Sequence, residues 1–224
     1  MGNSSQDSSA RVAFTAGFVI AALFVLTVLS APARELQAPG LAAEQLAALY
    51  REHRTAVLGG VYVGSLTWGG VFVAFSGALA AYLFMLGSEA GALIGLAGAV
   101  LEAAVILLFC AFSNAAAFVA GGGEPSTVLA LHQGALLANN ISGFPTIVCV
   151  GAFTMGGRRL GVFPAWVVAL AVVCILLHAV SSASLAPVGF FAPSGPASLM
   201  APFTMVLWVL GVSIVLRRGI RTAA

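Results

Sequence analysis

Six long apolar runs follow one another along the chain, separated by short connections that contain polar residues, glycine or proline. A helix needs about 20 mainly apolar residues to cross the hydrocarbon core of a bilayer, and each run reaches that length. The expected spans cover residues 12–31, 57–86, 90–120, 126–154, 162–184 and 197–216. The pattern predicts an all-α, polytopic integral membrane helix bundle that forms a single domain over residues 12–217.

The polar stretches outside these runs are short. Residues 1–11 are rich in serine and predict a disordered N-terminal tail, and residues 218–224 predict a C-terminal tail. Residues 40–55 place Leu46 and Tyr50 on one helical face and charged residues on the other, which predicts a short amphipathic interfacial helix. A helical connector resting on lipid headgroups is the favoured interpretation of this segment, and a lid over a cavity is the alternative.

Composition and charge narrow the class of protein. Hydrophobic residues make up 61% of the chain and charged residues only 7%, whereas soluble domains contain about 25% charged residues. A water-soluble fold is therefore excluded. The net charge of +2 is too small to indicate a nucleic-acid partner.

The arginines predict the orientation in the membrane. With six spans, one side receives Arg11, Arg158, Arg159, Arg217, Arg218 and Arg221, and the other receives Arg34, Arg51 and Arg54. Basic residues favour the cytoplasmic side. We therefore expect a cell (inner) membrane protein with both termini in the cytoplasm.

Polar side chains inside the spans are the strongest signal of function. Glu102 is the one acidic residue near the centre of a span, where a charged group costs about 3 kcal/mol. Counting at 1.5 Å per residue places Asn114, His132 and His178 at a common depth, with Glu102 and Asn139 deeper. The sequence thus predicts a polar pocket inside the bundle, although Asn114 is turned about 120° from Glu102 around their helix.

The candidate catalytic residues are Glu102 as a general acid and His132 and His178 as proton acceptors. Glu102 shares a helical stripe with Phe109 and Ser113. Candidate substrate-binding residues are the polar and aromatic side chains at similar depth: Asn114, Gln133, Asn139, Asn140, Trp68, Phe72, Phe109 and Phe144.

Two backbone features stand out within the spans. Pro145 and Gly143 predict a kinked or locally opened helix, either as a ligand or ion contact or as a kink satisfied by nearby side chains. Gly91, Gly95 and Gly98 recur at helical spacing, which predicts close packing of helices rather than chemistry.

Three classes of function fit these features. The first is an intramembrane isomerase or cyclase acting on an apolar lipid or isoprenoid, the second a proton-coupled small-solute transporter, and the third a structural or accessory membrane subunit. No nucleotide-binding loop, nucleophile elbow or aspartate-rich metal motif is present. We expect no cofactor and no metal site, a haem or metal on His132 and His178 being the alternative. The expected partners are the lipid bilayer, an apolar small-molecule substrate and, in a homo-oligomer, a second copy of the chain.

Overall fold

The computed structural model describes residues 2–28, 35–36, 38, 40–183, 189–192 and 195–223. Within these residues the chain is helical, with no strand. The elements are α1 (Gly2–Val28), α3 (Ala43–Glu52), α4 (Arg54–Ser65), the π-helix η1 (Leu66–Val71), α5 (Phe72–Met85), α6 (Glu89–Val119), α7 (Pro125–Ile141), α8 (Gly143–Arg159), α9 (Ala165–Ser182) and α10 (Pro196–Ala223).

Six helices of the described chain are long and apolar enough to cross a membrane, as the hydrophobic pattern predicts. They cover Ser5–Val28, Arg54–Met85, Glu89–Val119, Pro125–Arg159, Ala165–Ser182 and Ser198–Gly219. The second of these joins α4, η1 and α5, and the fourth joins α7 and α8. The all-α, multi-pass architecture is therefore confirmed.

The chain ends differ from the prediction. Residues 2–11, expected to be a disordered tail, form the first turns of α1, and α10 continues to Ala223. No proline interrupts residues 2–11, and Ala10 is already buried in the core. Packing of this helical face against the bundle outweighs the low helix propensity of the serines.

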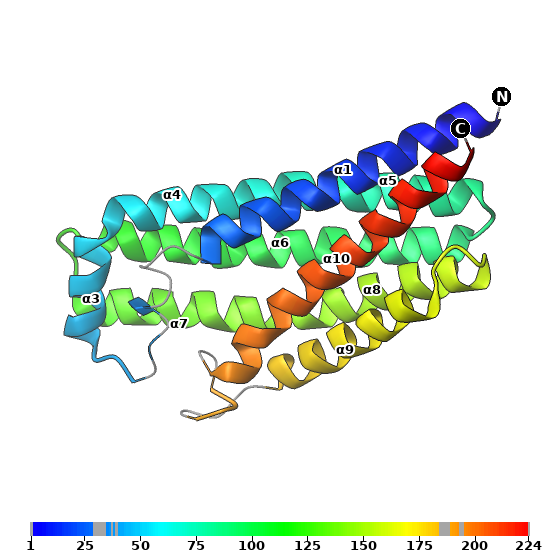
Figure 1. The fold of residues 1–224 in the computed structure, drawn as a ribbon. Coiled ribbons are helices and arrows are strands. Elements are labelled where there is room, and N and C mark those ends of the chain that lie inside the picture. The colour runs from blue at the N-terminus through cyan, green and yellow to red at the C-terminus, as the bar shows by residue number, and fades with distance from the viewer. Residues whose placement is uncertain are drawn as a thin grey trace.

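Most long helices run side by side, and the N- and C-terminal ends lie at the same end of the bundle (Figure 1). α6 packs against α7, α8, α5 and α4, while α10 packs against α1 and α9. The main core contains Phe72, Phe75 and Trp208, and the Trp208 Nε1–H donates a hydrogen bond to Thr154 Oγ1 at 3.0 Å.

The predicted packing role of the glycines in α6 is confirmed. A Cβ atom added at Gly98 would lie 2.6 Å from the backbone nitrogen of Cys149, and one at Gly95 would meet the ring of Phe153. One at Gly91 would lie 3.1 Å from the Cα atom of Gly156. The absence of side chains at these three positions lets the backbones of α6 and α8 approach closely.

Helix α3 crosses the end of the bundle opposite the two termini (Figure 1). Its apolar face buries Leu46, Ala47 and Tyr50 against its neighbours, chiefly α7. The short amphipathic helix is therefore present as predicted, and its apolar face is covered by protein. The alternative of a lid agrees with this packing.

Candidate functional site

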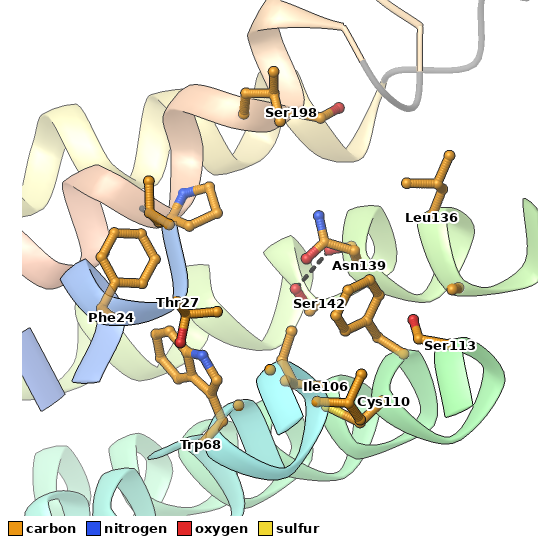
Figure 2. A pocket seen from close by; sticks show the side chains of 18 of the residues that line it. Phe24, Thr27, Trp68, Ile106, Cys110, Ser113, Leu136, Asn139, Ser142 and Ser198 are labelled. Atoms are coloured by element: carbon orange, nitrogen blue, oxygen red, sulfur yellow. Dashed lines mark hydrogen bonds between the residues drawn. The ribbon is translucent and has the colours of Figure 1, made fainter. Parts of the chain in front are cut away.

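A cavity of about 470 Å³ extends from α3 to the middle of α6. Its wall is built from α1, α3, α4, η1, α6, α7, α9 and α10, together with Leu36 and Ser142. Figure 2 shows side chains from several of these elements turned towards one space, among them Thr27, Trp68, Ser113 and Asn139. The volume falls in the range of about 300–1,000 Å³ that is typical of small-molecule sites.

Six of the residues singled out from the sequence line this cavity: Glu102, His132, His178, Asn139, Trp68 and Phe109. Ser113 joins Glu102 and Phe109 in the wall, as their common helical stripe predicts. The structure therefore brings the acid and both imidazoles of the predicted site to one cavity, from α6, α7 and α9.

Five predicted substrate-binding residues lie outside the cavity wall. Asn114 is half-buried on another face of α6, and Gln133 is exposed on α7. Asn140 is buried, and its backbone carbonyl accepts a hydrogen bond from the Ser182 hydroxyl at 2.9 Å. Phe72 is buried in the main core, and Phe144 is 59% exposed on the outside of the bundle. Depth along a helix alone cannot assign the direction in which these side chains point.

Glu102 is the buried acid of the cavity. The residue is 3% exposed, and its Oε2 atom has no hydrogen-bond partner among the described residues. The Thr146 side chain interacts with this carboxyl group, and the Thr146 hydroxyl itself donates to the Ser142 carbonyl at 2.9 Å. An unsatisfied buried oxygen is costly, so this arrangement favours a ligand that completes its hydrogen bonding.

His178 presents a fixed tautomer when its ring is neutral. Its Nδ1 atom lies 2.9 Å from the carbonyl oxygen of Cys174, which can only accept a hydrogen bond. Nδ1 therefore carries the hydrogen, and Nε2 is left as the unprotonated nitrogen. Because His178 lines the cavity, this nitrogen is the basic group that the residue offers to a ligand.

His132 is held by Tyr50, a residue that the sequence interpretation does not include in the site. The Tyr50 hydroxyl lies 3.0 Å from His132 Nδ1, with the two rings packed edge to face. Burial raises the pKa of Tyr50 to about 12, so the phenol keeps its proton. His132 Nδ1 is the one acceptor recorded for this hydroxyl among the described residues. A phenol that donates to Nδ1 leaves the neutral His132 ring with its hydrogen on Nε2.

The helix break between α7 and α8 borders the cavity at Ser142. The Ser142 hydroxyl donates to the Asn139 carbonyl at 2.6 Å, and the Ser182 hydroxyl donates to the Asn140 carbonyl. Figure 2 shows the bond between Ser142 and Asn139 at the cavity wall. Since side chains satisfy these carbonyls, the geometry favours a stabilised kink over an ion site.

Other wall residues were not predicted as site residues, namely Tyr50, Thr67, Ser113, Ser142 and Ser181. The amphipathic pattern around Tyr50 was a usable signal, because it places this ring on the face that must be covered. Thr67 lies in η1, and no signal in the sequence marks that π-helix. π-Helical turns are frequent at functional sites.

The described residues contain no group of three or more histidine, cysteine, aspartate or glutamate side chains placed to hold a metal ion. Cys110, Cys149 and Cys174 are free, buried thiols. The two imidazoles of the cavity are each engaged through Nδ1, by Tyr50 and by the Cys174 carbonyl.

Comparison with models of protein families, with curated proteins and with solved structures found no match to this chain. A function for the cavity is therefore inferred from its chemistry.

Proposed function

We propose that this multi-pass protein is an intramembrane enzyme that catalyses proton transfer on an apolar lipid or isoprenoid substrate, in an isomerisation or a cyclisation. The observation that carries the proposal is the common cavity of Glu102, the proposed acid, and His178, the proposed proton acceptor. His132 lines the same cavity, but its Nδ1 atom is occupied by the Tyr50 hydroxyl, so the role of proton acceptor falls to His178. A buried acid and a neutral imidazole with a free nitrogen are the groups that general acid–base catalysis requires. The largely apolar remainder of the wall suits a substrate drawn from the bilayer.

The proposed roles follow from the protonation states. Glu102, as a neutral acid, donates a proton to one carbon of a substrate double bond, and the resulting cation loses a proton from a neighbouring carbon to His178 Nε2. The double bond has then moved. If a second double bond of the substrate attacks the cation first, a carbon–carbon bond closes a ring, and the new cation loses its proton to His178 Nε2 in the same way; in both cases there is no net gain of atoms. Trp68 and Phe109 line the same cavity, and their ring faces stabilise positive charge as it develops. Proton exchange with water restores Glu102 and His178.

The test uses the purified protein in detergent, in D₂O, with a bacterial lipid extract supplemented with C15 to C30 isoprenoids. Mass spectrometry follows deuterium incorporation and the appearance of isomers. We expect Glu102→Gln to lower the rate by about 10²-fold or more, because the amide is not an acid. Gln133→Ala, an exposed residue outside the cavity, serves as the matched control and should leave the rate unchanged. Wild-type protein that exchanges no faster than buffer, or an unaffected Glu102→Gln variant, would refute the proposal.

A proton-coupled transporter is the second candidate, because the broken span α7–α8 borders the cavity at Asn139 and Ser142. Discontinuous helices form the substrate sites of many transporters. Solute uptake into proteoliposomes that responds to an imposed pH gradient would favour this function. Protein that shows neither uptake nor turnover, and co-purifies with another membrane protein, would instead be a structural or accessory subunit.

We also propose that the protein resides in the cell inner membrane with its termini in the cytoplasm. The support is the excess of arginines on the side of Arg11, Arg158 and Arg217. The α3 end of the cavity would then face outwards. Cysteine labelling with a membrane-impermeant reagent tests this, since a cysteine placed at Gly122 should react in intact cells and one at Gly161 should not.

A further inference from the structure

The cavity wall carries no arginine or lysine among the described residues that line it. All nine basic residues of the chain are arginines, and the ionisable groups at the wall are Glu102, His132, His178, Tyr50 and Cys110. Phosphate groups are held in proteins by arginine, lysine or free backbone N–H groups at helix N-termini. A phosphate placed beside an unpaired carboxyl group in an apolar cavity would lose its hydration without compensation.

The start of α10, which lies at the cavity wall, does not supply the missing donors. Ser198 and Leu199, near the start of α10, line the cavity, but their backbone N–H groups donate to the carbonyl of Gly195. At the break between α7 and α8, the Thr146 N–H donates to the Ser142 carbonyl. These N–H groups are therefore not available to a phosphate.

The wall instead offers hydrogen-bond acceptors. Ser142 and Thr67 each give their hydroxyl hydrogen to a backbone carbonyl three or four residues earlier in the chain, at 2.6 and 2.7 Å. What remains on these oxygen atoms is lone pairs, which accept hydrogen bonds. His178 Nε2 is likewise an acceptor when the ring is neutral, because Nδ1 holds the hydrogen. A ligand that donates a hydrogen bond matches these groups.

Glu102 lies beside this set of acceptors. Its carboxyl group interacts with Thr146, one turn after Ser142, and lies within electrostatic range of Cys174, one turn before His178. Its Oε2 atom is without a partner among the described residues. A ligand hydroxyl can accept a hydrogen bond from the carboxylic acid and donate one to Ser142 or His178. The first of these two hydrogen bonds gives the buried acid the partner that it lacks.

We propose that the cavity binds a neutral, mainly apolar molecule that carries a hydroxyl group, anchored by Glu102, Ser142 and His178, and that it rejects phosphate-bearing lipids. This inference rests on the proposed function in that the bound molecule is the substrate as it first binds, with its hydroxyl on Glu102; the double bond takes the place of the hydroxyl at the acid before the proton is transferred. It narrows the substrate class from any apolar lipid to an uncharged alcohol.

The test compares ligands that differ in one group. Tritiated geranylgeraniol and farnesol are bound to the protein in nanodiscs and displaced by geranylgeranyl methyl ether, geranylgeranyl diphosphate or the hydrocarbon phytane. We expect the alcohol to bind about tenfold more tightly than the ether, which keeps the oxygen but cannot donate. The diphosphate and phytane should bind at least tenfold more weakly than the alcohol. A diphosphate that binds as tightly as the alcohol, an ether equal to the alcohol, or no saturable binding of either alcohol would overturn the inference.

A variant pair tests the anchor. Glu102→Leu should lower the affinity for the alcohol about tenfold and leave that for phytane unchanged, whereas Gln133→Leu, outside the cavity, should change neither. Glu102→Leu removes an unsatisfied buried group, so the variant should fold, and the ligand comparison on the wild-type protein does not depend on it. Equal alcohol affinities in the two variants would contradict the anchor.

The two proposals fail separately. Alcohol binding without turnover of any isoprenoid contradicts the enzyme and leaves the ligand class standing. Turnover of a diphosphate contradicts the ligand class and leaves the enzyme standing.

Discussion

Gly98 is a position at which a very small substitution should have a large effect on the packing of the bundle. In Gly98→Ala, the new Cβ atom would lie 2.6 Å from the Cys149 nitrogen and 3.0 Å from both the Cys149 Cα atom and the Pro145 oxygen. Ordinary van der Waals contact begins at 3.4 Å. All three atoms belong to the backbone of α8, so the clash is relieved only by separating α6 from α8.

The magnitude follows from two opposing effects. Overpacking of this kind costs about 1–3 kcal/mol. Replacing glycine by alanine inside a helix returns about 1 kcal/mol. We expect Gly98→Ala to lower the free energy of unfolding by up to about 2 kcal/mol, and to lie about 1–3 kcal/mol below an alanine that is placed in a helix without a clash. Because Glu102 lies one turn further along α6, the same shift should also disturb the cavity.

The assay is reversible unfolding in mixed micelles with increasing dodecyl sulfate, followed by circular dichroism. Gly77→Ala is the matched control. Gly77 lies in α5, and a Cβ atom added to it would meet no other atom within 4 Å. We expect this control to equal or exceed the wild-type stability by up to about 1 kcal/mol. A Gly98→Ala variant as stable as Gly77→Ala would refute the assigned contact between α6 and α8.

Tyr50 and Trp208 give further predictions. Tyr50→Phe should leave His132 Nδ1 without its partner and raise the fraction of the ring that carries hydrogen there, as measured by ¹⁵N NMR. Burial raises the Tyr50 pKa from 10.0 to about 12, so the folded state holds this proton more tightly. That stabilisation is complete below pH 10 and is lost as the pH rises to 12, and Tyr50→Phe should remove this loss. Trp208→Phe breaks the bond to Thr154 within the core and should cost about 2 kcal/mol in unfolding free energy.

Exposed residues of the same types provide the controls. Tyr62 is 72% exposed and Trp166 is 42% exposed. Tyr62→Phe should leave the His132 spectrum unchanged, and Trp166→Phe should change the stability by less than about 0.5 kcal/mol. Identical ¹⁵N spectra for Tyr50→Phe and the wild type would contradict the hydrogen bond between Tyr50 and His132. Equal losses of unfolding free energy in Trp208→Phe and Trp166→Phe would contradict the hydrogen bond between Trp208 and Thr154.

The spans themselves were predictable because the membrane imposes a length and a polarity that a single sequence displays directly. The ends were not, since whether residues 2–11 continue a helix depends on their packing against the rest of the bundle. The amphipathic helix was placed correctly in the chain, but the surface that covers Tyr50 is supplied by α7, far away in sequence.

The site was predictable in part for the same reason. Glu102, Phe109 and Ser113 share one face of an uninterrupted helix, so local periodicity groups them correctly. That periodicity also separates Asn114 from Glu102, in agreement with the cavity wall. Gln133 and Phe144 lie at suitable depths but face outwards, and only the packing of whole helices decides such directions.

The π-helix η1 has a consequence for the whole second span. An α-helix turns about 100° per residue, so the wider π-turn holds one residue more than an α-helical turn and offsets the faces of α4 and α5 by that angle. Counting heptads from Val57 therefore assigns wrong faces beyond Leu66. Deleting one residue within Leu66–Val71 would leave a continuous helix of nearly the same length. It would rotate Phe75 away from the Trp208 ring, so the span would still insert while its inner surface no longer matched its neighbours.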